Sequence, residues 1–159
     1  MPLYGDFKLV VPLFPNGPLK LFGKPYHEDG SAKDWSLITL DERLKSTHTA
    51  RGIKPMSFSL GEPDVFELLD GSFALFGATI PDRNRGTVSR IAVVSSDLKQ
   101  ERFLDPPQSP LTDHALLGAA VPTGKPGEFA VVKTLQDRER EIADPSARMG
   151  MALDFIEIR

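Results

Sequence analysis

The chain has 159 residues, of which 40% are apolar and 26% are charged, and its formal net charge is −3. These values are close to the averages for soluble globular proteins, so we expect residues 1–159 to form a single domain rather than a disordered or membrane-embedded chain. The 19 basic and 22 acidic side chains are mixed along the sequence, which leaves no broad positive field and argues against nucleic acid as a partner.

Cysteine is absent, so disulfide bonds, thiolate nucleophiles and thiolate metal sites are excluded. The longest apolar stretch, residues 115–121, is far shorter than the roughly 20 residues that cross a bilayer. The first residues also lack the basic start and continuous apolar middle of a secretory signal. We therefore expect a soluble protein, either cytoplasmic or part of an assembled particle, with no membrane contact.

The first third of the sequence predicts three strands. Apolar residues alternate with other residues in the pattern of a strand with one face turned inward, at Phe7, Leu9, Val11 and Leu13. Pro12 favours an edge position for this strand, because proline cannot donate to a ladder. After a turn at residues 15–18, residues 19–22 and 35–40 form the next two strands. Residues 44–55 have little periodicity and fit either a loop or one irregular turn of helix, so we assign no element to them.

The middle of the sequence carries the clearest strand signals. Residues 56–60 alternate strictly between apolar residues and serine. Residues 65–69 and 73–80 flank Asp70-Gly71, which predicts a hairpin closed by a type I′ turn with positive φ at both turn residues. Residues 88–94 are rich in β-branched side chains, so we expect a central strand buried on both faces.

The last third predicts one helix and two strands. Ser109 is a candidate cap, with Pro110 at the first helical position, and the short helix would turn Leu111, Ala115 and Leu116 inward. Residues 129–135 are predicted as a strand, and residues 136–142 as a turn of helix or a long hairpin tip. The C-terminal segment alternates at Met149, Met151, Leu153 and Phe155. We expect it to be paired, because a free strand would expose these side chains.

The sequence contains an internal repeat. Residues 71–76 followed by Asp82-Arg83 return as residues 127–132 followed by Asp137-Arg138, and residues 21–23 match residues 75–77. Each copy joins an apolar run to a polar reversal, which is the unit of an antiparallel hairpin. The copies lie 54 to 56 residues apart and divide the chain into three.

These elements predict an all-β fold. Roughly nine short strands separated by turn signals, with one short helix, favour a single-domain antiparallel β-barrel or β-sandwich. The threefold internal repeat leaves a pseudo-threefold β-trefoil as the alternative.

The sequence offers no recognisable catalytic or metal-binding motif. The three histidines, His27, His48 and His114, lack the spacing that places two ligands on one face. Asp113-His114 is explained by its place near the start of the predicted helix, and no Gly-x-Ser-x-Gly elbow is present. Nucleotide-binding loops are absent as well. We therefore expect no cofactor and no metal.

Two features are candidates for binding. Arg83, Arg85 and Arg90 form the densest cationic segment, and guanidinium groups are suited to carboxylate or phosphate recognition. A solvated hairpin tip explains the same charges. Trp35 is the single tryptophan and has the amphipathic character that protein interfaces favour.

The sequence thus favours a non-catalytic binding or assembly module that contacts a protein partner or a second copy of itself. A structural subunit of a viral or tube-like particle and an inhibitor or immunity-type interaction protein both fit this description. The alternative is a small β-barrel enzyme or carrier for a hydrophobic molecule, in which His48, Asp113 and His114 would do the acid–base work.

Overall fold

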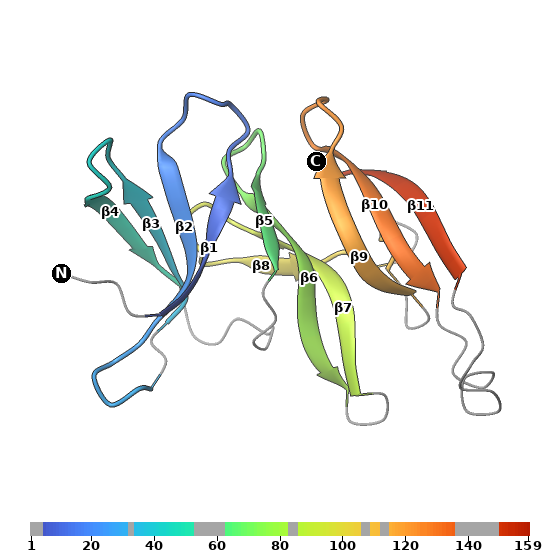
Figure 1. Ribbon diagram of the computed structural model, residues 1–159, viewed down its shortest axis with the longest axis horizontal. Helices are drawn as coiled ribbons and strands as arrows, with labels where there is room; N and C mark the ends of the chain where they lie inside the picture. Colours follow the sequence, from blue (N-terminus) through green and yellow to red (C-terminus); the bar gives the residue numbers. More distant parts are fainter. Residues whose placement is uncertain are drawn as a thin grey trace.

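A computed structural model describes residues 5–31, 34–52, 63–82, 86–105, 109–111, 115–135 and 150–159 of this all-β chain (Figure 1). Its strands are β1 Gly5–Val11, β2 Leu19–Pro25, β3 Ser36–Leu40, β4 Ser46–Arg51, β5 Asp64–Glu67, β6 Phe73–Asp82, β7 Gly86–Val94, β8 Glu101–Phe103, β9 Ala115–Pro122, β10 Glu128–Leu135 and β11 Gly150–Glu157. The described residues contain no helix, and hence none long and apolar enough to cross a membrane.

The strands form two antiparallel groups joined into one sheet, and a third group that forms a sheet of its own. The larger sheet has the order β4-β3-β2-β1-β5-β6-β7-β8 and curls into half a barrel. Its pairs are antiparallel, apart from a short parallel contact in which Val10 pairs with Val65 and Val11 with Phe66. The smaller sheet has the order β11-β10-β9. We call β1–β4 meander 1, β5–β8 meander 2 and β9–β11 meander 3, and Figure 1 shows them side by side.

The internal sequence repeat corresponds to equivalent positions in the three meanders. Phe22, Phe76 and Val132 occupy matching positions on the second strand of each meander, β2, β6 and β10. Gly71 and Gly127, which open the two stronger copies, precede β6 and β10 with φ of 80° and 76°. The repeats therefore come one after another as meanders, and the sheet order is not that of the closed barrel of a β-trefoil.

Two apolar clusters hold the meanders together, and meander 2 takes part in both. The cluster between meanders 1 and 2 consists of Val10, Phe22, Trp35, Leu37, Val65, Phe73, Leu75, Ala92, Val94 and Leu98. The cluster between meanders 2 and 3 consists of Phe66, Leu68, Ala74, Phe76, Ile91, Val93, Leu104, Leu111, Ala120, Phe129, Val131 and Ile158. Residues 91–94 of β7 are buried on both faces, as predicted for the strand of residues 88–94, but β7 lies next to the edge strand β8 rather than at the centre of the sheet.

The predictions for the first strand are wrong in two respects. β1 lies inside the larger sheet, between β2 and β5, rather than at its edge. Pro12 comes directly after the last residue of the strand, so its missing N–H is not needed in the ladder. The inward face is also reversed, since Val10 is buried while Leu9 and Val11 are exposed. Apolar residues occupy both odd and even positions of this segment, so the neighbouring strands determine which face is buried.

Other predictions need correction in detail. The hairpin of residues 65–80 is confirmed, but Gly71 alone in its turn has positive φ, and the Leu68 N–H donates to the Ser72 carbonyl at 2.8 Å. The closure is therefore a three-residue loop rather than a type I′ turn. Residues 46–51 form β4, within the segment to which the sequence assigns no element. Residues 56–60 and 136–142 lie outside the described residues.

The predicted helix does not continue where the structure can be described. The Ser109 Oγ accepts a hydrogen bond from the Leu111 N–H at 3.1 Å, as a cap would, and Leu111 is buried. Ala115 and Leu116, however, begin β9 and pair with Leu135 and Thr134 of β10. Local capping is thus present, and strand pairing determines the conformation from Ala115 onward. The prediction that residues 1–159 form one domain stays a prediction.

The packing makes Phe76 a test of the cluster between meanders 2 and 3. Its ring is fully buried and lies 5.5 Å from Phe66 and 4.9 Å from Phe129 between centroids. We expect Phe76→Ala to lower the free energy of unfolding by about 3–5 kcal/mol, because it leaves a cavity there. Urea unfolding followed by circular dichroism measures this loss. The control Leu69→Ala, at an exposed turn, should change stability by less than about 0.5 kcal/mol; equal losses would contradict the prediction.

Candidate functional site

The faces between neighbouring meanders define the candidate site. We call the face turned toward the next meander the forward face, and the face turned toward the preceding meander the backward face. At the first junction, Val10, Phe22 and Leu37 on the forward face of meander 1 belong to one cluster with Val65, Phe73 and Leu75 on the backward face of meander 2. At the second junction, Phe66, Phe76 and Ile91 belong to one cluster with Ala120, Phe129 and Val131.

Strand register shows which residues of the three meanders are equivalent. Phe22 pairs with Leu37, Phe76 with Ile91, and Val132 with Leu153. Leu37, Ile91 and Leu153 are therefore equivalent positions on the forward faces. By the same reasoning Val121, which pairs with Ala130, is equivalent to Phe66, which pairs with Ala74.

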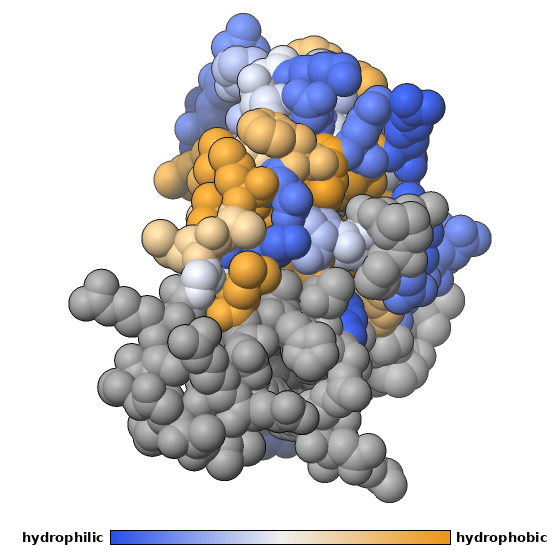
Figure 2. All heavy atoms as spheres, turned by 90° about the vertical axis from the view of Figure 1, so that its right-hand side faces the viewer, coloured by the Kyte–Doolittle hydropathy of each residue, from blue (hydrophilic) through white to orange (hydrophobic). Residues whose placement is uncertain are grey.

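The forward face of meander 3 is apolar and uncovered. Leu153 is 57% exposed, whereas its equivalents Leu37 and Ile91 are buried. Val121 is 56% exposed, whereas Phe66 is buried, and the alternating neighbours Met151 and Phe155 are exposed as well. Figure 2, which views the molecule from this side, shows apolar side chains gathered on the surface.

The backward face of meander 1 is exposed at three apolar positions, although Ile38 on the same face is buried. Leu19 precedes Phe22 by three residues, as Phe73 precedes Phe76 and Phe129 precedes Val132. Leu19 is 43% exposed, whereas Phe73 and Phe129 are buried. The adjacent strand β1 adds the exposed side chains of Leu9 and Val11. The two ends of the row of meanders thus each present an apolar surface.

Charged groups near meander 3 lie off the forward face or at its margin. Asp154 is paired in register with the buried Val131 and ion-pairs with Lys133 at 2.5 Å, on the side turned toward meander 2. At one end of the sheet, the Arg159 Nε contacts the Glu157 Oε1 at 3.1 Å. This hydrogen bond and the charge of the guanidinium lower the pKa of Glu157 and raise that of Arg159. The forward face of meander 3 thus has an apolar centre and a charged pair at one margin.

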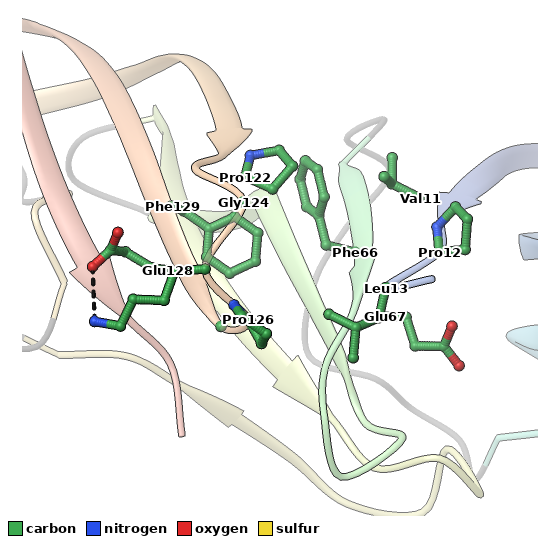
Figure 3. Close-up of a pocket in the computed structure, with 12 residues that line it drawn as sticks. Val11, Pro12, Leu13, Phe66, Glu67, Pro122, Gly124, Pro126, Glu128 and Phe129 are labelled. Atoms are coloured by element: carbon green, nitrogen blue, oxygen red, sulfur yellow. Dashed lines mark hydrogen bonds and ion pairs between the residues drawn. The ribbon is translucent and has the colours of Figure 1, made fainter. Parts of the chain in front are cut away.

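A cleft of about 240 Å³ lies between the end of β1, strand β5 and the turn that joins β9 to β10 (Figure 3). Phe66 and Phe129, whose ring centroids are 5.1 Å apart, form its apolar part, and Leu13 and Pro126 lie at its sides.

The charged groups of this cleft already have partners. Glu67 is ion-paired with Lys20. Glu128 accepts hydrogen bonds from Thr123 at 2.7 Å and from Lys125 at 3.1 Å, which lower its pKa and favour the carboxylate. A carboxylate stabilised in this way is a poor general acid near neutral pH. The cleft is therefore suited to contact with an apolar group rather than to acid–base chemistry.

The structure places three of the predicted site residues. His48 is exposed on β4, and Arg90 is half-buried on β7, where its Nη1 donates to the Ser89 carbonyl at 3.1 Å. Trp35 is buried between meanders 1 and 2, with its ring 5.0 Å from that of Phe22 and 4.8 Å from the Lys24 Nζ. Arg83, Arg85, Asp113 and His114 lie outside the described residues. The roles assigned to all of these residues stay predictions.

Within the described part of the chain, no group of three or more His, Asp or Glu residues is placed to hold a metal ion.

The residues of the two uncovered faces were not predicted as site residues. A signal for one face was present, because residues 151–155 alternate and were expected to form a paired strand. The pairing with β10 is confirmed, yet it covers the edge of the strand and not its face. The face can be recognised because β11 has apolar residues on both of its sides. Ile156 and Ile158 lie on the side opposite to Met151, Leu153 and Phe155.

The turn beside the cleft offers a matched pair of glycines. Gly124 and Gly127 both have positive φ, of 93° and 76°, but a Cβ at Gly124 would meet nothing within 4 Å, while one at Gly127 would lie 2.6 Å from the Ile158 carbonyl oxygen. We expect Gly124→Ala to cost about 1 kcal/mol of stability through backbone strain alone. Gly127→Ala should cost about 2–3 kcal/mol, because it also displaces the chain at Ile158. Urea midpoints measure the difference, and equal losses would contradict it.

Comparison with known proteins gives no match for this chain among protein-family models, curated proteins or solved structures.

Proposed function

We propose that this protein is a non-catalytic assembly module that binds a protein partner through the forward face of meander 3. One observation supports the proposal. Positions that are buried at the junction of meanders 1 and 2 and at the junction of meanders 2 and 3 are exposed on meander 3, which no further meander of the described chain covers. Leu153 stands where Leu37 and Ile91 are covered by the next meander. A surface of the same composition is therefore available for the same kind of contact.

The energetics support this role. Burying one Leu, Val, Met or Phe side chain yields about 1.5–3 kcal/mol, and the forward face of meander 3 exposes Val121, Met151, Leu153 and Phe155. Proteins built from stacked repeats carry polar outer faces on their terminal repeats, because apolar ends reduce solubility. Meander 3 has no such polar face over these positions. Contiguous apolar surface of this kind marks interaction sites.

The alternative of a carrier or small barrel enzyme has less support. A drug-sized ligand needs a concave site of about 300–1,000 Å³ that encloses most of its surface. The space between the described sheets is filled by the two apolar clusters, and the cleft of 240 Å³ opens at the surface. No specific observation on the described residues favours this alternative.

A photo-crosslinking experiment tests the proposal. A benzophenone amino acid is introduced in place of Phe155, which is 65% exposed, and in a separate control in place of Leu69, which is 67% exposed at a turn off both faces. We expect irradiation of cells that produce these proteins to give defined protein adducts at position 155 and none above background at position 69. Equal yields at the two positions, or no adduct at 155, would contradict the role of this face.

A further inference from the structure

The two uncovered faces of this chain correspond to the two sides of the junctions between its meanders, one inside the larger sheet, where β1 pairs with β5, and one between the two sheets. At the first junction, Val10 and Leu37 pack with Val65 and Phe73. At the second, Phe66 and Ile91 pack with Ala120 and Phe129. The equivalent forward positions that remain are Val121 and Leu153, and the equivalent backward positions are Leu9 and Leu19.

The bare positions show the same break in pattern at both ends. Leu9 pairs with Leu21, as Val65 pairs with Leu75 and Ala120 with Val131, so these three first-strand residues are equivalent. Leu9 is 55% exposed, whereas Val65 and Ala120 are buried. Val121 and Leu153 are thus exposed forward positions of meander 3 whose described equivalents are buried. Leu9 and Leu19 are likewise exposed backward positions of meander 1, where Ile38 alone among the named residues of that face is buried.

We propose that a second copy of this chain docks head to tail, with the forward face of meander 3 of one copy on the backward face of meander 1 of the other. This inference rests on the proposed function and names its partner. The surface that fits a forward face in this molecule is a backward face, and the chain itself carries one that is free. The contact is heterologous, since two different surfaces meet.

A closed ring of this kind would contain two copies. Heterologous contacts produce a ring when the rotation closes, and an open filament when it does not. Meanders 1 and 2 have four strands each, and three strands of meander 3 are described. Four-stranded sheets of this kind arranged around an axis form β-propellers, which typically contain 4–8 sheets. One copy supplies three meanders, two supply six, and three would supply nine. Two copies therefore supply a number of meanders within this range, and in a ring of two each uncovered face would contact the other kind of face.

Charge substitutions on each face test the arrangement. The oligomeric state of the wild-type chain is measured by size-exclusion chromatography with light scattering over a dilution series, beside Leu153→Glu, Leu19→Glu and the control Leu69→Glu. All three sites are exposed, so the variants should retain the circular dichroism of the wild type. We expect a wild-type dimer, a loss of affinity of about 100-fold in each face variant, and no change in the control.

Mixing the two face variants distinguishes head-to-tail docking from a symmetric contact. A mixture of Leu153→Glu and Leu19→Glu contains one intact junction, formed by the unaltered forward face of one variant and the unaltered backward face of the other. We expect heterodimers at concentrations at which each variant alone is monomeric. If Leu153→Glu dissociates the dimer while Leu19→Glu leaves it intact, the head-to-tail arrangement is overturned.

The outcomes separate this inference from the proposed function. A wild-type monomer at high concentration, whose position 155 still crosslinks to a different protein, overturns the second copy as partner and leaves the proposed function standing. A wild-type monomer without adducts at position 155 overturns both. Adducts that join position 155 of one copy to meander 1 of another, located by mass spectrometry, support both.

Discussion

Apolar packing between neighbouring meanders is the interaction on which this structure depends. Meander 2 is apolar on both faces, because Val65 and Phe73 point toward meander 1 while Phe66 and Phe76 point toward meander 3. A sheet of this kind is stable only when other elements cover both of its sides. The stability of each meander is therefore set largely by its immediate neighbours, as it is in proteins built from stacked repeats. The same dependence makes a bare end meander informative.

Polar contacts orient the meanders more than they stabilise them. The ion pair of Lys20 with Glu67 joins meanders 1 and 2, and the Lys20 Nζ also lies 5.9 Å from the centre of the Phe73 ring. Ion pairs that retain contact with solvent contribute about 0–1 kcal/mol each. Burial of a single large apolar side chain contributes about 1.5–3 kcal/mol. The charged groups thus fix how two faces meet, and the apolar side chains supply the free energy that holds them together.

Local signals predicted much of the fold, and the parts that depend on neighbours escaped prediction. The hairpin of residues 65–80 and the strand at residues 88–94 follow from turn residues and β-branched composition, which act over a few positions. The inward face of β1 depends on where meander 2 lies, so the alternation of Leu9 and Val11 led to the wrong prediction of which face is buried. The uncovered faces were missed for the same reason, because exposure at Leu153 or Leu19 is set by the absence of an adjacent sheet and not by local sequence.

The composition of β11 carries the argument for a third junction. A strand that packs on one side needs apolar residues at one parity, and Ile156 and Ile158 supply them on the side turned toward meander 2. Polar residues at the other parity would serve the described contacts equally well and would keep the surface soluble. Leu153 and Phe155 stand there instead, exposed at 57% and 65%. β1 shows the same excess at Leu9 and Val11. These side chains lie on the outward faces of meanders 3 and 1, at opposite ends of one row, and the proposed head-to-tail contact would cover both faces.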